Sequence, residues 1–394
     1  MISRKIRENL GKSSWIRAMF EEGEKLRKVY GADKVYDFSL GNPEVEPPEE
    51  VKNNLKAIVN SGKPGVHRYM SNAGYDDVRQ KVAHYFGREK GVRIGAEHII
   101  MTCGAAGGLN VVLKTILDPG DEVILFSPYF VEYLFYIDNH GGKSIVVPVD
   151  KNTFQPDLNL LEEHIGPSTK AIIVNSPNNP TGVIYGENTL LRMADIIEAK
   201  EHEYGSPIFI IADEPYDKII YDGAKLPSIP AIFKNSITVN SFSKSLALPG
   251  ERIGYIAVGS TVSDASLLVE GLIFSNRILG FVNAPSLFQK VVANSLEASV
   301  DIGFYEERRN LLYNSLVELG FTCTKPDGAF YLFPKSLIDD DVEFAKRALK
   351  YNLLIVPGEG FGWPGHFRLS YCISIETIKN SISAFEALAK EFIK

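Results

Sequence analysis

Four polar residues follow a strand-like run near the middle of the chain, and their types suit a phosphorylated aldehyde. They are Ser241, Ser243, Lys244 and Arg252, in the segment VNSFSKSLALPGERIGY, residues 239–255. A lysine amine forms an imine with an aldehyde, and desolvation or nearby positive charge favours its reactive neutral form. A guanidinium and two hydroxyls form a compact phosphate site beside that amine. The alternative explanation is a solvated turn that carries an unrelated arginine.

Asp213 comes directly after the apolar run PIFIIA. A carboxylate at the end of a buried strand is costly unless it has a cationic partner. The protonated ring nitrogen of pyridoxal phosphate is such a partner, because the pair keeps the ring cationic and electron-withdrawing. Taken alone, Asp213 is better explained as a cap of the next turn or as the partner of a structural arginine.

A second anion-binding element is the small-residue segment TCGAAGGLNVVL, residues 102–113. Small residues between a strand and a helix let the backbone N–H groups of Ala105 and Ala106 approach an anion at the helix N-terminus. The segment is not a nucleotide P-loop, because neither GxxxxGK[ST] nor a full GxGxxG is present. Read alone, it more often forms a tight turn.

Three further residues have types that suit a flat heteroaromatic ring. Phe130, in FSPYFVEY, follows a strand and could stack on such a ring. Asn179, in NSPNNPTG, and Tyr216, three residues after Asp213, could donate hydrogen bonds to a ring oxygen. Without context, a core or loop aromatic explains Phe130 better, and an asparagine in a turn-rich segment needs no function.

Composition limits the class of protein. The chain has 394 residues, 45% hydrophobic and 23% charged, which predicts a soluble globular protein of two domains. A formal net charge of −7 argues against nucleic acid as the main partner. Three cysteines without paired spacing (Cys103, Cys323 and Cys372) favour a reducing compartment over a disulfide or metal framework. The N-terminus has no apolar signal core, and no run of about 18 apolar residues occurs, so we expect a cytoplasmic protein without a membrane span.

Short β-branched runs that end in small or polar residues recur from about residue 97, with helix-like stretches between them. Such alternation predicts an α/β fold with a mostly parallel sheet covered by helices on both faces. Ligands bind beyond the carboxyl ends of the strands in such sheets, where the polar residues above occur. The runs are HIIMTCG, EVILFSPYF, KSIVVPV, KAIIVNSPNNPTG, PIFIIADEPY and SITVNSFSK.

The pattern changes after about residue 290. A long helix-like stretch covers residues 285–320, followed by short strand-like runs and an amphipathic terminal helix. We therefore predict an N-terminal segment at 1–45 that packs with the small domain, a large cofactor-binding domain at 46–289 and a small α+β domain at 290–394.

Together these motifs resemble those of the fold type I pyridoxal phosphate enzymes, specifically the class I and II aminotransferases. The resemblance is carried by Ser241-Phe-Ser243-Lys244 and by Gly250 with Arg252-Ile-Gly254-Tyr255, at the family's spacing. It covers nearly the whole chain, since YMSNAG, GAAGGL, SPYF, NNPTG, ADEPY and GHFRLSY occur in the family's order. It implies a seven-stranded, mostly parallel sheet in the large domain, and pyridoxal 5′-phosphate as the cofactor.

The resemblance also implies a role for individual residues. Lys244 is expected to form the covalent link to the cofactor and to move the proton at the substrate's α-carbon, while Asp213 holds the ring nitrogen. The other implied cofactor contacts are Asn179 and Tyr216 at the phenolic oxygen, Phe130 stacked on the ring, and Ser241, Ser243, Arg252 and the backbone of Ala105 and Ala106 at the phosphate.

Two residues are implied in substrate binding, and one in a neighbouring subunit's site. Arg368, in FRLSY, is expected to clamp the substrate α-carboxylate in a bidentate fork, helped by the backbone of Gly41. Tyr69 is expected to reach the phosphate bound by the other subunit, which predicts a homodimer. The N-terminal segment and the small domain are expected to close over the substrate and exclude water.

The predicted reaction is reversible transfer of an amino group between an L-amino acid and a 2-oxo acid by a ping-pong route. Aspartate and 2-oxoglutarate are the leading pair, because Arg277 lies near where acid-specific relatives supply a second cation; a plain interface arginine explains it equally well, and Lys63 is a weaker candidate. A carbon–sulfur β-lyase of the same fold is one alternative. A regulatory protein that binds the cofactor without turnover is another, disfavoured by the acidic chain and the absence of an added DNA-binding module.

Overall fold

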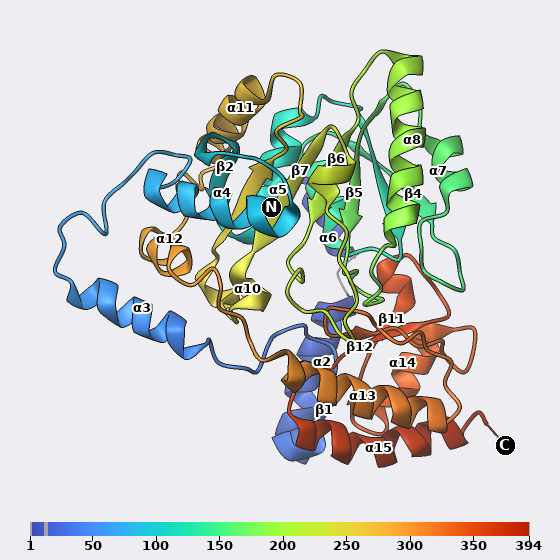
Figure 1. Ribbon diagram of the computed structural model, residues 1–394. Helices are drawn as coiled ribbons and strands as arrows, with labels where there is room; N and C mark the ends of the chain where they lie inside the picture. Colours follow the sequence, from blue (N-terminus) through green and yellow to red (C-terminus); the bar gives the residue numbers. More distant parts are fainter. Residues whose placement is uncertain (1, 12–14, 394) are drawn as a thin grey trace.

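A seven-stranded sheet forms the centre of the larger part of the chain (Figure 1). The computed structural model describes residues 2–11 and 15–393. The strand order is β2-β8-β7-β6-β5-β3-β4, and β8 runs antiparallel to both of its neighbours while the other pairings are parallel. The predicted mostly parallel, seven-stranded sheet is thus confirmed. The strands are β2 (Ile99–Thr102), β3 (Glu122–Ser127), β4 (Lys143–Pro148), β5 (Thr169–Asn175), β6 (Phe209–Asp213), β7 (Ser236–Ser241) and β8 (Gly254–Val258).

Helices cover both faces of this sheet because its strands are apolar on both sides. In β5, Ile172 and Val174 join one buried cluster, whereas Ala171 and Ile173 join the cluster on the opposite face. The first face is covered by α7 (Leu158–His164), α8 (Glu187–Tyr204) and α9 (Ile229–Ile232). The second is covered by α5 (Gly104–Ile116), α6 (Glu132–Asn139) and α11 (Ala265–Ile278). Alternating side chains of a buried strand require this arrangement.

A third apolar cluster lies against β2 and β8 and includes residues of α4 (Asp76–Lys90) and α12 (Ser286–Ala293). The projecting helix α3 (Glu49–Asn60) packs on α12. The helix predicted over 285–320 is divided in two, because α12 ends at Ala293 and α13 (Ile302–Glu318) begins only after its N-cap Asp301, whose carboxylate accepts from the backbone N–H of Gly303. The proposed domain limit at 290 falls inside α12 and stays a prediction.

The N-terminal segment lies beside the C-terminal elements, as the blue and red ribbons at the bottom of Figure 1 show. β1 pairs in parallel with β10, and β11, β12 and β9 form a small antiparallel sheet. One core cluster unites side chains of α13, α14 and α15 with those of β9, β10 and β12. The elements are α1 (Arg4–Gly11), α2 (Trp15–Tyr30), β1 (Tyr36–Asp37), β9 (Tyr331–Leu332), α14 (Asp341–Leu349), β10 (Leu353–Leu354), β11 (Val356–Pro357), β12 (Phe367–Ser370) and α15 (Ile375–Lys390), with short 3₁₀ helices at Ala32–Lys34, Ala96–His98, Pro249–Glu251 and Gly358–Phe361.

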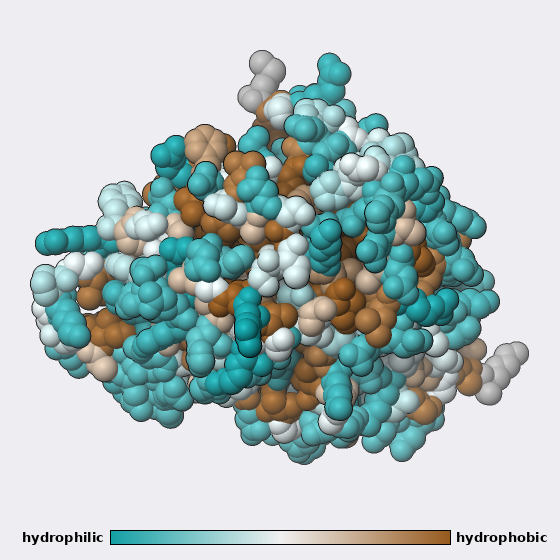
Figure 2. All heavy atoms as spheres, turned by 45° about the horizontal axis from the view of Figure 1, so that its top comes forward, coloured by the Kyte–Doolittle hydropathy of each residue, from teal (hydrophilic) through white to brown (hydrophobic). Residues whose placement is uncertain are grey.

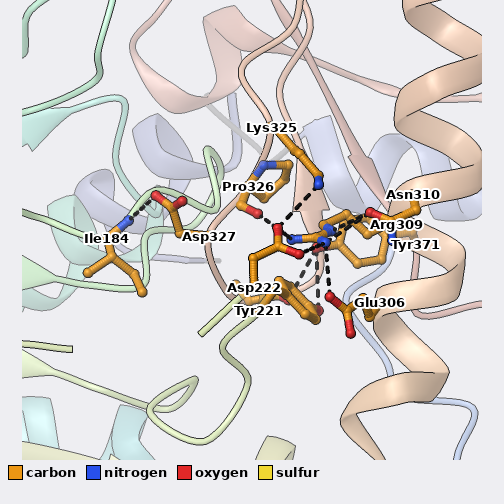
Figure 3. A network of polar contacts seen from close by, with 11 residues as sticks. Ile184, Tyr221, Asp222, Glu306, Arg309, Asn310, Lys325, Pro326, Asp327 and Tyr371 are labelled. Carbon is orange, nitrogen blue, oxygen red and sulfur yellow. Dashed lines mark hydrogen bonds and ion pairs between the residues drawn. The ribbon is translucent and has the colours of Figure 1, made fainter. Parts of the chain in front are cut away.

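A buried arginine fastens α13 to the loop that follows β6 (Figure 3). The side chain of Arg309 is fully buried and forms an ion pair with Asp222 at 3.0 Å. It also donates to the backbone carbonyl of Pro326 at 3.0 Å and lies over the Tyr221 ring, 4.4 Å from its centroid. A guanidinium can satisfy several acceptors at once because its donors are held in a planar fork. This network therefore holds the C-terminal core against the large sheet.

The surface seen in Figure 2 is mostly hydrophilic, with apolar side chains in smaller groups. None of the helices in the described part of the chain combines the length and the apolarity needed to cross a bilayer.

Candidate active site

A cavity of about 310 Å³ lies where β5, β6 and β7 end and residues of the C-terminal core approach. Ligands bind at this edge in open α/β sheets, because the strand ends there leave polar side chains and backbone groups unpaired. The predicted residues that line it are Gly41, Ala105, Ala106, Phe130, Asn179, Asp213, Tyr216, Ser241, Ser243, Lys244, Arg252 and Arg368. The fold thus brings together side chains that are up to 327 positions apart in the chain, from Gly41 to Arg368.

Asp213 is the last residue of β6 and is buried. Its Oδ2 accepts a 2.5 Å hydrogen bond from the Tyr133 hydroxyl, whereas its Oδ1 has no partner among the described residues. Burial raises the pKa of Asp213 to about 7; the bond from Tyr133 opposes this shift and the charge of Glu214 adds to it. A buried carboxylate oxygen without a partner fits a cationic group in the cavity.

Lys244 lies in the short helix α10 (Phe242–Ser245), which directly follows β7. The helix begins there because the Ser241 hydroxyl accepts the backbone N–H of Ser243 as an N-cap. Desolvation first, and the charges of Arg368 and Arg252 with it, lower the pKa of Lys244 to about 8 against an opposing effect of Cys372. Its Nζ donates to the carbonyl of Gly41 at 2.6 Å. An amine with this pKa is partly neutral near pH 8 and can act as a nucleophile.

The hydroxyls of Ser241 and Ser243 lie 2.7 Å apart, beside Arg252 in the same lining. Arg252 has a left-handed backbone (φ 52°) and donates to the carbonyl of Pro249 at 2.9 Å. Gly104 opens helix α5 opposite it with φ 71°, and a Cβ there would lie 2.8 Å from Nη2 of Arg252. Glycine is therefore needed at 104 for both the backbone angle and the approach of the guanidinium. One cation, two hydroxyls and a helix N-terminus make this corner suitable for a phosphate.

Arg368 lies on β12, in the C-terminal core, and lines the cavity. It is buried, donates to Asn179 Oδ1 at 3.1 Å and to the carbonyl of Ser39 at 2.5 Å, and its Nε has no partner among the described residues. Its guanidinium carbon lies 4.7 Å and 4.8 Å from the ring centroids of Tyr331 and Phe361. The stacked, tethered guanidinium with an unpaired donor fits a carboxylate ligand.

The remaining predicted residues form the walls of the cavity. The Phe130 ring packs edge-on against Tyr133, with centroids 5.5 Å apart. The Tyr216 hydroxyl lies 2.9 Å from that of Tyr331. A Cβ on Gly41 would overlap the Tyr331 hydroxyl, so a larger residue at 41 would displace this wall.

Four titratable residues of the lining were missed by the sequence analysis: Glu132, Tyr133, Tyr136 and Tyr331. The first three lie within six residues of Phe130, in the same FVEYLFY segment, and a helix period through that segment would have placed them on or near one face. For Tyr331 the signal was weak, because it lies in an apolar run (GAFYLFP) that reads simply as a core strand.

Three predicted residues do not line the cavity of the single chain. Arg277 is exposed near the end of α11, with its guanidinium carbon 5.1 Å from the Phe274 ring centroid. Tyr69 is 88% exposed and Lys63 is also exposed. Their predicted roles depend on a second subunit and stay predictions.

The chain is similar to known aminotransferases over most of its length. The model of the family "Aminotransferase class I and II" matches residues 33–385. A probable aspartate/prephenate aminotransferase of Thermus aquaticus is 34% identical over 88% of this chain and 89% of the relative, and the aspartate aminotransferase of Bacillus subtilis is 32% identical over 93% and 94%. Among solved structures, an amino transferase from Eubacterium rectale has a TM-score of 0.97 at 42% identity, covering 100% of both chains. The aspartate aminotransferase of Thermus thermophilus with maleate has a TM-score of 0.88 at 29% identity, covering 98% of this chain and 99% of that one.

Proposed function

This chain belongs to the class I and II aminotransferases, and we propose that the cavity at the carboxyl ends of β5, β6 and β7 is its active site. It is a pyridoxal phosphate-dependent enzyme that transfers an amino group between an L-amino acid and a 2-oxo acid. The fold class predicted from the sequence is confirmed by the sheet and by the solved relatives.

The residues of the cavity fit the cofactor. The observation that carries this assignment is the unpaired, buried Oδ1 of Asp213 in the same cavity as the desolvated amine of Lys244. When bound, the cofactor supplies an aldehyde that takes up the amino group and a cationic ring that withdraws electrons from the substrate. In our proposal Asp213 holds the ring nitrogen, Phe130 stacks on the ring, and Asn179 and Tyr216 donate to its phenolic oxygen. The phosphate is held by Ser241, Ser243, Arg252 and the backbone of Ala105 and Ala106.

The chain's own residues then perform three tasks. Arg368 binds the substrate α-carboxylate through its unpaired Nε and neighbouring donors, helped by the backbone of Gly41. Lys244 would hold the cofactor covalently through Nζ, and the same amine would take the proton from the substrate α-carbon, which a pKa of about 8 makes possible near neutral pH. The aromatic walls exclude water from the reacting atoms.

Three finer predictions remain proposals. The names of the relatives support aspartate as a substrate, whereas Arg277, on which the sequence prediction was based, is exposed in the single chain; 2-oxoglutarate as the second substrate stays a prediction. The homodimer is supported by the 88% exposure of Tyr69 and by exposed Leu267, Phe274 and Ile278 on α11, since apolar side chains gathered on one surface helix are typical of an interface. A cytoplasmic location likewise stays a prediction.

The assignment is tested by following the cofactor's absorbance while single amino acids are added without an acceptor. We expect a spectral change with at least one L-amino acid, and formation of the corresponding 2-oxo acid; pyruvate and ammonia from cystathionine would instead favour the carbon–sulfur lyase.

Lys244→Ala should abolish borohydride trapping of the cofactor on the chain and lower turnover by at least about a thousandfold. The exposed Lys234→Ala variant is the matched control and should retain both. Retained turnover in Lys244→Ala would contradict the proposal.

A further inference from the structure

The charges that line the cavity are not all used by the proposed function. Its cations among the described residues are Lys244, Arg252 and Arg368, and each has a role with the cofactor or with the substrate α-carboxylate. Its carboxylates are Asp213, which faces the ring nitrogen, and Glu132, which has no role so far. Among the described residues that line the cavity, one carboxylate therefore has no assigned role, whereas every cation has one.

Glu132 is the first residue of helix α6 and is partly buried. Its Oε2 is shielded from solvent and has no hydrogen-bond partner within the described residues. No lysine, arginine or histidine of those residues lies within 4.0 Å of its carboxylate as an ion-pair partner. Burial raises the pKa of the Glu132 carboxyl, while its own backbone N–H and the charge of Arg368 lower it. The Glu132 carboxylate therefore lies near enough to Arg368 to feel its charge, but it forms no ion pair with it.

A structural role explains Glu132 less well. Acidic residues are common in the first turn of a helix, because they interact favourably with the helix dipole. Such residues normally keep their carboxylate in water, and the exposed Glu187, which opens α8, is an example in this chain. A shielded oxygen with no partner costs free energy that the helix dipole alone offsets poorly. The arrangement is explained if a ligand brings the missing donor.

We propose, on the basis of the function proposed above, that Glu132 determines side-chain specificity by accepting a hydrogen bond from an amide or amine on the substrate side chain. In this proposal Arg368 orients the α-carboxylate, and Glu132, in the lining of the same cavity, accepts from the substrate side chain. A substrate with a side-chain carboxylate meets a like charge in a site shielded from water, which is strongly unfavourable. This preference opposes the aspartate and 2-oxoglutarate pair, which was predicted from Arg277 and of which the names of the relatives support aspartate, so one experiment decides between them.

The experiment compares substrates of the same shape in the holoenzyme. L-Asparagine and L-aspartate differ in a side-chain amide against a carboxylate, as do L-glutamine and L-glutamate, and kcat/KM is measured for each in the half-reaction. We expect the amide of each pair to be preferred by roughly a hundredfold, the ratio that a like-charge contact of a few kcal/mol corresponds to. In Glu132→Gln the ratio of the two kcat/KM values should fall to about one. The glutamine side chain is uncharged, and it can donate to a substrate carboxylate as well as accept from a substrate amide. Because the kcat/KM ratio is taken within each pair, any loss of activity that the substitution causes for both substrates cancels.

Binding supplies a readout that does not depend on turnover. Succinate and succinamate, which differ in the same way, are titrated against the holoenzyme by their effect on the cofactor's absorbance. Wild-type protein should bind succinamate more tightly, and Glu132→Gln should bind succinate at least about tenfold more tightly than wild type does. Glu187→Gln is the matched control, since it removes a glutamate from the same helix position outside the cavity.

The outcomes separate this inference from the proposed function. If no amino acid changes the cofactor's spectrum, the aminotransferase assignment of this cavity is wrong. If amino acids react but aspartate and glutamate match or exceed their amides, the inference about Glu132 is wrong and the proposed function stands. Equal ratios in wild type and Glu132→Gln would also overturn it.

Discussion

Replacing Asp213 by asparagine tests whether this buried carboxylate destabilises the cofactor-free protein and stabilises the protein with its cofactor bound. This side chain is buried at the end of β6, with Oδ1 unpaired among the described residues. Asparagine has nearly the same shape, and its amide oxygen can still accept from the Tyr133 hydroxyl. The substitution therefore removes the charge and little else.

The magnitude follows from the pKa of Asp213. Burial raises it from 3.8 to about 7, so the folded protein keeps a proton that the unfolded chain releases above pH 3.8. Raising the pH through the window from 3.8 to about 7 therefore lowers the stability of the folded state. Each pKa unit corresponds to about 1.36 kcal/mol, so the full loss above pH 7 is about 4 kcal/mol. Below pH 3.8 the two states are protonated alike and the loss is absent.

The assay is denaturant unfolding of cofactor-free wild type and Asp213→Asn at several pH values between 4 and 9. We expect the variant to be more stable above pH 7 by up to about 4 kcal/mol, with the difference shrinking toward pH 4. With the cofactor added, the order should reverse, because only the carboxylate can pair with the ring nitrogen. Asp195→Asn, which changes an exposed aspartate on α8, is the control and should follow the wild-type curve.

Parallel pH profiles for wild type and Asp213→Asn would refute this reasoning. They would mean that Asp213 is ionised in the cofactor-free protein at no cost, and that its buried position does not prepare it for a cation.

Two further substitutions test the substrate clamp and the contact between the two cores. Arg368→Lys should raise KM for amino acids by roughly a hundredfold, because an ammonium cannot form the planar fork and leaves Asn179 Oδ1 and the Ser39 carbonyl without their donors; steady-state kinetics check this, and an unchanged KM would remove Arg368 from the substrate site. Arg309→Met should lower stability by about 2 kcal/mol, because it leaves the buried Pro326 carbonyl without its donor and Asp222 with Lys325 as its remaining ion-pair partner (Figure 3); thermal unfolding measures the loss, and the exposed Arg192→Met should show almost none.

Much of the site could be predicted from the sequence because the relevant signals are local. Asp213, Ser241 and Lys244 each follow an apolar run within a few residues, and the carboxyl ends of parallel strands meet at one edge. The small residues around Gly104 likewise indicate a close approach to an anion from their types and spacing alone. Family motifs in the right order then assign roles that single residues leave ambiguous.

Local patterns along the chain were therefore sufficient for the α/β class, the mostly parallel sheet and most of the residues around the cavity. The surroundings of those residues depend instead on contacts between distant segments. The bond from Tyr133 to Asp213 joins positions 80 residues apart, and the bond from Arg368 to the Ser39 carbonyl joins positions 329 apart. The lowered pKa of Lys244 and the raised pKa of Asp213 come first from desolvation, and desolvation depends on which distant segments pack around a group. The unpaired carboxylate of Glu132 emerged for the same reason, since an absent partner can be recognised only when all the neighbours of a side chain are known.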